Sequence, residues 1–257
     1  MEWFLKQDIV AQAMIAGVGT YLLTVAGTVP VFFFRRAPRR LLDALMGFGA
    51  GVMVAASCWS LLLPALERGG IARTTVGLLM GAGILFAIDQ VLPHLHPEFP
   101  EEAVQEGPPV PWRRSALLML AITLHNFPEG MAVGVAYAAG DIAAANVLAV
   151  GIGLQNIPEG LAVALPLRRD GMSRLKAFWY GQLSATVEPL AAVIGAAVAI
   201  SSAAFLPYGM AGAAGAMLYV VVEEMIPETT RSGSSDVATL GFIAGFTVMM
   251  VMDSAFG

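Results

Sequence analysis

Residues 124–136 read LHNFPEGMAVGVA and residues 154–165 read LQNIPEGLAVAL, so one pattern occurs twice, thirty positions apart. Each copy places a His or Gln, an Asn and a Glu inside an apolar run that is long enough to cross a bilayer. An ionisable group at that depth costs roughly 2.5–3.5 kcal/mol on insertion scales. Two copies of the same costly arrangement predict one shared polar site, which the rest of the chain supports.

The composition predicts an all-α integral membrane protein. Hydrophobic residues make up 57% of the chain and charged residues 13%, whereas a soluble domain carries about 25% charged residues. The apolar residues fall into blocks of roughly twenty, the length that spans a bilayer. We expect a single transmembrane domain, 1–257, with eight transmembrane helices. The predicted helices lie at about 9–34, 41–66, 74–92, 115–138, 143–167, 175–200, 207–226 and 237–256.

The basic residues predict the orientation in the membrane. The loops after the first, third, fifth and seventh predicted helices hold eleven of the fourteen Lys and Arg residues. Loops rich in Lys and Arg face the cytoplasm, so these loops, including 93–114, are predicted to be cytoplasmic. Both termini are then outside, as in a multi-pass protein of the inner (plasma) membrane. Because the basic residues lie in loops beside the membrane, they give no support for nucleic-acid binding.

The fourth predicted helix carries the first copy of the pattern. His125 and Glu129 are four residues apart, so they lie on one helix face. Pro128 lacks a backbone N–H and predicts a kink that frees the Leu124 carbonyl. Kinked membrane helices with polar groups at the midplane mark the substrate sites of many transporters. The fifth predicted helix repeats the arrangement with Gln155, Asn156, Pro158 and Glu159.

The side chains of the two copies suit a divalent metal ion. Imidazole, carboxylate and amide ligands are typical of sites for Zn, Fe or Mn, and the lack of a thiolate argues against a tight structural zinc site. Glu188, beside Pro189 in the sixth predicted helix, is a third carboxylate in an apolar run. Three nearby carboxylates cannot all stay ionised unless cations are present, so either metal ions neutralise them or some of them take up protons. We therefore expect protons to compete with the metal. The alternative role for the Asn, Gln and His residues is hydrogen bonding between helices.

Further candidates lie outside the two copies. Met53 in the second predicted helix either adds a thioether ligand or is an ordinary core methionine. Asp89, Glu223 and Glu224 lie near the cytoplasmic ends of the third and seventh helices. They form an exit or secondary metal site, or they are interfacial residues that reach water. The loop residues His94 and His96 either bind metal loosely together with nearby acidic residues or belong to a solvated acidic linker. Glycines such as Gly51 and Gly81 predict close helix contacts.

The paired motifs HNFPEG (125–130) and QNIPEG (155–160) resemble those of the ZIP (Zrt-, Irt-like protein) family of divalent metal transporters. The stretches GFGAGVMVAAS (47–57), VEPL (187–190) and EEMIPETTR (223–231) are similar to those of its bacterial members. The resemblance extends from about residue 42 to the end of the chain. It implies eight helices with an inverted 3+2+3 repeat, in which helices four and five carry a binuclear metal centre. It also implies an elevator-like or rocking motion and a homodimer.

Carried over residue by residue, the resemblance implies two metal positions. The second position would lose a negative charge relative to members that have Asp where this chain has Asn156, so we expect it to bind metal more weakly or to regulate. Many members also have His where this chain has Gln155. The first position would use Met53, His125, Glu129, Gln155 and Glu159. The second would use Asn126, Asn156 and Glu188, with Glu129 and Glu159 bridging.

The sequence therefore predicts a transporter that moves a divalent cation, Zn²⁺ before Cd²⁺, Fe²⁺ or Mn²⁺, into the cytoplasm by alternating access. No GxxxxGK[ST] motif is present, and we expect no organic cofactor. A metal-selective channel with the same ligands is the alternative. An intramembrane metalloenzyme is less favoured, because it would usually need an HExxH-like pair, and no second His lies near His125.

Overall fold

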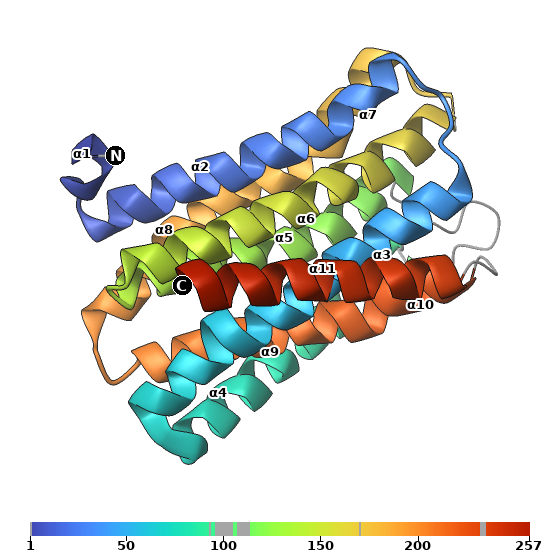
Figure 1. Cartoon of the computed structure of the whole chain (residues 1–257). Helices are drawn as coiled ribbons and strands as arrows, with labels where there is room; N and C mark the ends of the chain where they lie inside the picture. The colour runs from blue at the N-terminus through green and yellow to red at the C-terminus, as the bar shows by residue number, and fades with distance from the viewer. Residues whose placement is uncertain (1, 93, 96–104, 107–113, 170, 232–234) are drawn as a thin grey trace.

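The computed structural model describes residues 2–92, 94–95, 105–106, 114–169, 171–231 and 235–257. Long helices lying side by side make up almost all of this part of the chain (Figure 1). Two short strands, β1 (His94–Leu95) and β2 (Gln105–Glu106), pair antiparallel. The helical elements are α1 (Glu2–Leu5), α2 (Ile9–Thr28), η1 (Val29–Phe32), α3 (Arg39–Ala56), η2 (Ser57–Leu62), α4 (Leu63–Val91), α5 (Arg114–Ala138), α6 (Ile142–Arg169), α7 (Arg174–Leu183), η3 (Ser184–Thr186), α8 (Val187–Ser201), α9 (Leu206–Val220), η4 (Val221–Met225), α10 (Ile226–Arg231) and α11 (Ser235–Phe256).

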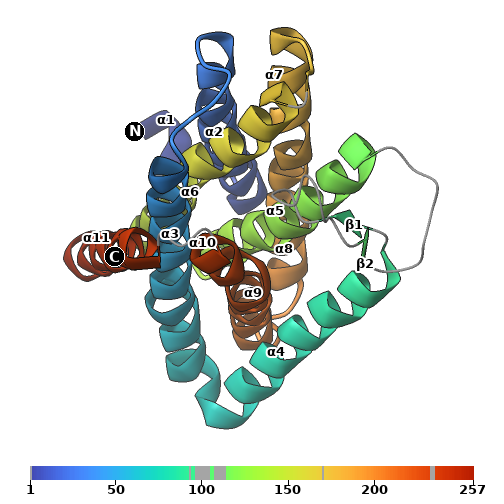
Figure 2. The same cartoon turned by 90° about the vertical axis from the view of Figure 1, so that its right-hand side faces the viewer.

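The number of membrane crossings agrees with the prediction. By length and hydropathy, six helical segments of the described chain can cross a membrane, and one of them, Arg39–Val91, has 53 residues. That segment contains a sharp turn at Gly70, where φ is 70° and ψ is 173°, so it makes two crossings, seen as the diverging α3 and α4 in Figure 2. Helix α5 adds 25 residues, enough for an eighth crossing. Both termini lie at the same end of the bundle (Figure 1).

Local sequence signals set the helix ends. The Asp8 carboxylate accepts a hydrogen bond from the Ala11 N–H at 2.8 Å, and the Ser173 hydroxyl accepts one from the Lys176 N–H at 3.3 Å. Such capping bonds satisfy N–H groups that have no partner within the helix. Pro128 and Pro158 lie within α5 and α6 without ending either helix. The membrane-buried motif thus sits on two helices that continue through their prolines.

The helices associate in close pairs: α3 with α11, α4 with α9, α5 with α8, and α2 with α6. Glycines lie at these contacts. A Cβ added to Gly51 would lie 2.0 Å from the Phe242 carbonyl oxygen on α11, and one added to Gly81 would lie 1.9 Å from the Gly212 carbonyl oxygen on α9. Any larger side chain would push the backbones apart. The prediction that these glycines form packing surfaces is confirmed.

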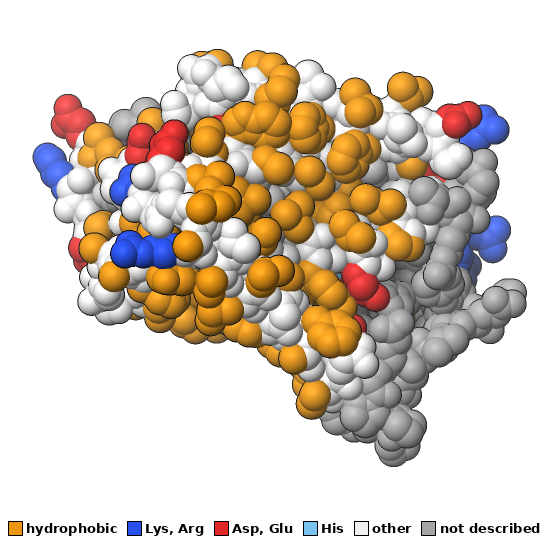
Figure 3. Space-filling model, turned by 90° about the horizontal axis from the view of Figure 1, so that it is seen from below, with side chains coloured by type: hydrophobic (Ala, Val, Ile, Leu, Met, Phe, Trp, Pro, Cys, Tyr) orange, Lys and Arg blue, Asp and Glu red, His pale blue; other side chains and the backbone are white. Residues whose placement is uncertain are grey.

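The surface of the bundle suits a bilayer. In the view of Figure 3, hydrophobic side chains cover the middle of the molecule, and charged side chains lie mainly toward its two ends. Many large apolar residues are exposed, such as Leu79 at 67% and Leu240 at 71%. In water such a surface would be a large unpartnered apolar patch, whereas lipid chains cover it without cost. The chain is an all-α, multi-pass membrane protein.

Candidate metal centre

The polar residues of the repeated motif lie in the interior of the bundle. Helices α5 and α6 are joined by a short turn at 139–141, so they run antiparallel and the two copies of the motif come together. Glu188 reaches the same region from the first turn of α8. His125 and Glu159 are partly buried. The residues with an exposed fraction of 1% or less are Asn126, Glu129, Gln155, Asn156 and Glu188.

The first hydrogen-bonded pair joins the two motifs directly. The Gln155 side-chain amide donates a hydrogen bond of 2.6 Å to Oε1 of Glu129. The other oxygens of the pair, Oε2 of Glu129 and Oε1 of Gln155, are buried and have no hydrogen-bond partner. The pair therefore fixes the orientation of both side chains and leaves one acceptor oxygen on each.

The second pair joins α6 to α8. Nδ2 of Asn156 lies 3.0 Å and 2.9 Å from the two carboxylate oxygens of Glu188 and 3.2 Å from the Thr20 carbonyl oxygen. The amide nitrogen thus faces Glu188 and α2. Oδ1 of Asn156, on the other side of the same amide group, is buried without a partner. As in the first pair, a hydrogen bond orients the amide and leaves its oxygen available.

The acidic residues form one electrostatic group. Glu129 interacts electrostatically with both Glu159 and Glu188, and Glu159 interacts with His125. Several negative charges in a buried site repel one another and lose their hydration, which is unfavourable unless cations neutralise them. The arrangement is therefore suited to binding cations.

The unpartnered atoms support the same conclusion. Buried polar atoms in proteins nearly always have a hydrogen-bond partner. Among the described residues, four buried oxygens of the paired motifs lack one, and the amide nitrogen of Asn126 is also unpartnered. Carboxylate and amide oxygens together with one imidazole are ligands that suit a divalent cation of moderate affinity. The four oxygens are Asn126 Oδ1, Glu129 Oε2, Gln155 Oε1 and Asn156 Oδ1.

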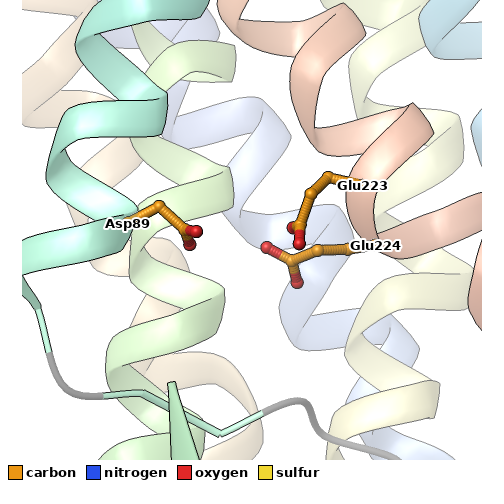
Figure 4. A group of neighbouring side chains, drawn as sticks. All are labelled: Asp89, Glu223 and Glu224. Atoms are coloured by element: carbon orange, nitrogen blue, oxygen red, sulfur yellow. The ribbon is translucent and has the colours of Figure 1, made fainter. Parts of the chain in front are cut away.

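A second acidic cluster lies nearer the end of the bundle that carries β1 and β2. Asp89 on α4 faces Glu223 and Glu224 on η4 (Figure 4), and one carboxylate oxygen from each lies within 4.8 Å of the others. Element η4 is a π-helix, a widened turn that is frequent at functional sites. In this turn, two consecutive glutamates both point toward Asp89. The Tyr219 hydroxyl also donates a hydrogen bond to Oδ2 of Asp89 at 3.4 Å.

His125 connects the two clusters. Its Nε2 lies 2.5 Å from Oε1 of Glu224, while the residue also interacts electrostatically with Glu159. The sequence placed Glu224 near one end of its helix and gave no reason to pair it with His125. Only the packing of α5 against α9, the helix that continues into η4, brings these residues together. The structure therefore forms a continuous row of ligand-type side chains from Glu129 and Glu159, through His125, to the cluster at Asp89.

The other predicted residues are placed less completely. Met53 is fully buried on α3, in the core cluster that includes Ala132 of α5 and Ile152 of α6. His96 lies outside the described residues, and only the backbone of His94, in β1, is described. The metal hypothesis for this pair of histidines therefore stays a prediction. Two further residues, Thr20 and Thr24 of α2, contact Glu188, and their sequence positions gave no sign of this contact.

The glycine that ends each copy of the motif explains how the helices come so close. A Cβ added to Gly130 would lie 2.4 Å from the Glu188 carbonyl oxygen on α8, and one added to Gly160 would lie 2.4 Å from the Thr24 carbonyl oxygen on α2. Real Cβ atoms do not make such contacts, so only glycine permits this spacing. The Glu–Gly dipeptide thus combines a charged side chain with a close helix contact in both copies.

Comparisons with known proteins agree with this arrangement. The family model described as ZIP Zinc transporter matches residues 109–253, which include both copies of the motif. The human protein named Zinc transporter ZIP11 is 41% identical over 96% of this chain and 98% of its own length. Zinc transporter ZIPB of Bordetella bronchiseptica is 40% identical over 96% of this chain and 82% of its own length. Zinc transporter ZupT of Escherichia fergusonii is 33% identical over 92% of each chain.

Proposed function

The chain belongs to the ZIP zinc transporter family, and we propose that it moves Zn²⁺ into the cytoplasm by alternating access through the site between α5 and α6. The observation that carries this proposal is the buried group of three carboxylates and four unpartnered oxygens inside a membrane-spanning bundle. Ionisable residues at membrane depth are rare and mark substrate pathways. The relatives are named zinc transporters, so transport of a divalent cation accounts for the site better than catalysis does.

Two cation positions are proposed within this site. The first uses Met53, His125, Glu129, Gln155 and Glu159, and the second uses Asn126, Asn156 and Glu188, with Glu129 and Glu159 shared. Asn156 already donates to both oxygens of Glu188, so a cation at the second position would compete with this hydrogen bond. We therefore infer that the first position binds the transported ion more tightly. Cd²⁺, Fe²⁺ and Mn²⁺ use similar ligands and are the other candidate substrates.

The acidic cluster at η4 is the proposed release route. A cation that leaves Glu129 and Glu159 would next bind His125 and then Glu224. Nε2 of His125 lies 2.5 Å from Oε1 of Glu224. Asp89 and Glu223 come next, within 4.8 Å of Glu224. At each transfer between neighbouring side chains, the cation exchanges some oxygen or nitrogen ligands for others, so it keeps protein ligands along the whole route. His94 and His96 lie beyond this cluster in the chain and are candidates for a final, loose contact.

The wider architecture belongs to the same proposal. Residues 1–257 form one transporter domain with an inverted 3+2+3 repeat. In such a repeat, α2, α3 and α4 correspond to α8, α9 and α11, and α5 corresponds to α6. The contact of α3 with α11 then corresponds to that of α9 with α4, and the contact of α2 with α6 corresponds to that of α8 with α5. The positive-inside rule places both termini outside the cytoplasm. We propose further that the protein lies in the inner (plasma) membrane, forms a homodimer and transports its cation without an organic cofactor.

Metal uptake into proteoliposomes that hold the purified protein tests the function. We expect saturable uptake of Zn²⁺, compared in parallel with Cd²⁺, Fe²⁺ and Mn²⁺, and its loss in the His125→Ala/Glu129→Ala variant. Glu67→Ala, which removes an exposed carboxylate of α4, is the control for loss of a carboxylate outside the site. Uptake that rises linearly with concentration and does not saturate would instead indicate a channel. Uptake that persists in the double variant would mean that the ion takes another path.

A further inference from the structure

Three threonines form a buried row along α2. Thr20, Thr24 and Thr28 follow one another at intervals of four and have exposed fractions of 2%, 3% and 0%. A threonine in an apolar helix usually satisfies its hydroxyl with a carbonyl of its own helix. Thr28 does so, because it donates to the Val25 carbonyl oxygen at 2.7 Å. Thr20 also bonds its own helix, through the Gly17 carbonyl oxygen, but it lies beside the Glu188 carboxylate, and the Thr24 hydroxyl donates to that carboxylate directly.

The side chains of Thr20 and Thr24 lie against Glu188. Oγ1 of Thr24 donates to Oε1 of Glu188 at 3.4 Å, and the Thr20 side chain lies close enough to the same carboxylate to interact with it. The Thr20 hydroxyl also lies 2.9 Å from the Gly17 carbonyl oxygen. Since a hydroxyl has one proton to donate, and an ionised carboxylate is the stronger acceptor, Glu188 is the favoured partner whenever it is charged.

The backbone of Thr20 takes part as well. Its carbonyl oxygen accepts a hydrogen bond from Nδ2 of Asn156 at 3.2 Å, and the same nitrogen contacts both oxygens of Glu188. Helix α2 therefore orients the amide that holds Glu188 and also contacts the carboxylate itself. The carboxylate is held from two sides, by α2 and by α6.

Close backbone contacts fix α2 in this register. A Cβ added to Gly17 would lie 2.9 Å from Cα of Pro189, the residue after Glu188. The Thr24 carbonyl oxygen lies against Gly160, just as the Glu188 carbonyl oxygen lies against Gly130. Thr24 and Glu188 thus occupy matching places beside the two copies of the motif. Their side chains meet, because the Thr24 hydroxyl donates to the Glu188 carboxylate at 3.4 Å.

We propose that Thr20 and Thr24 are positioning residues of the metal site, whose hydroxyls hold the Glu188 carboxylate in the orientation that serves the bound cation. This role rests on the proposed transport function. Without the hydroxyls, only Asn156 restrains the carboxylate, and Glu188 rotates away from the ligand set for part of the time. A hydrogen bond of this kind contributes about 1 kcal/mol net, so loss of both is expected to weaken zinc binding by about fivefold or more.

The test uses two substitutions that separate the hydroxyl from the methyl group. Thr20→Val/Thr24→Val keeps the shape and removes both hydroxyls, while Thr20→Ser/Thr24→Ser keeps the hydroxyls and removes the methyl groups. Thr28→Val is the matched control, because its hydroxyl bonds to its own helix. The readouts are the Kd of zinc for the detergent-purified protein, and KM and maximal rate for zinc uptake into proteoliposomes.

We expect the double valine variant to raise Kd and KM by about fivefold or more, with little change in maximal rate, while the double serine and Thr28→Val variants stay close to the wild type. A normal Kd in the double valine variant with a raised Kd in the double serine variant would show that the methyl groups act by packing, and would overturn the inference. An unchanged or lowered Kd in the double valine variant would overturn it as well. If the wild type binds zinc but does not transport it, the transport proposal fails, and the effect on Kd still decides the role of the threonines.

Discussion

Substitution of Gly130 by Ala should separate two helices at the metal site. The added Cβ would lie 2.4 Å from the Glu188 carbonyl oxygen, 2.7 Å from the Ala191 Cβ and 2.9 Å from the Glu188 Cα. Ordinary contact begins at 3.4 Å, so the shortfall to the carbonyl oxygen is 3.4 − 2.4 = 1.0 Å. Two of these atoms belong to the α8 backbone and the third is a Cβ fixed to it, so α8 itself must move away from α5.

The expected cost follows from that displacement. Overpacking of this kind destabilises a protein by about 1–3 kcal/mol, and the better helix propensity of Ala offsets up to about 1 kcal/mol of it. The movement also carries Glu188, whose contacts with Asn156 are 2.9 Å and 3.0 Å. A further separation of about 1 Å would exceed the usual hydrogen-bond range. We therefore expect both a lower melting temperature and weaker zinc binding.

The assay compares Gly130→Ala with Gly19→Ala, the same substitution on α2 at a position with no atom within 4 Å of the added Cβ. Thermal unfolding in detergent and zinc uptake into proteoliposomes are measured for both variants. We expect Gly19→Ala to match or exceed the wild type in melting temperature, with unchanged KM. If Gly130→Ala matched Gly19→Ala in both measurements, the close approach of α5 and α8 could not be what holds Glu188 in place.

Further predictions concern the site and its cation. Glu224→Gln should slow the release of zinc from loaded protein while changing its binding affinity little, because it removes the carboxylate beside His125; stopped-flow release with a fluorescent chelator measures this, and wild-type release rates would count against the route. Zinc should raise the melting temperature, and EDTA should reverse the rise, because a ligand at 100 times its Kd stabilises the folded state by about 2.7 kcal/mol; no shift in differential scanning fluorimetry would argue against a native-state site. Zinc binding should weaken from neutral to acidic pH, because protons compete for Glu129, Glu159 and Glu188; titration calorimetry that gave a constant affinity would contradict this competition.

Much of the fold could be predicted from the sequence. Apolar runs separated by charged turns gave eight crossings, because in lipid the length and polarity of a segment decide whether it spans. The sharp turn at Gly70 lies at the end of a Glu-Arg-Gly-Gly cluster (67–70) that separates two apolar runs in the sequence. The π-helices η2 and η4 were not predictable, because a widened turn depends on the packing of neighbouring helices and has no composition of its own.

The site was predicted in part. The two copies of the motif identified Glu129, Gln155 and Asn156, because polar groups in an apolar run are conspicuous. The contact between His125 and Glu224 was missed, since it depends on the widened turn of η4 and on tertiary packing. The threonines of α2 were missed for another reason, because a hydroxyl in a membrane helix is ordinarily satisfied within its own helix. Thr20 and Thr28 both bond a carbonyl of α2, and only their position relative to Glu188 distinguishes Thr20 and Thr24 from Thr28.

The most direct test of the metal centre is to locate zinc itself, by anomalous diffraction at the zinc edge from crystals of the protein grown with Zn²⁺. We predict a peak between α5 and α6, with zinc about 2.0–2.2 Å from ligand atoms of His125, Glu129 and Glu159. A weaker second peak beside Asn126 and Glu188 would agree with the second position. Zinc found only at the Asp89 cluster or in the 93–114 loop, with none between α5 and α6, would contradict the assignment of the transport site to the repeated motif.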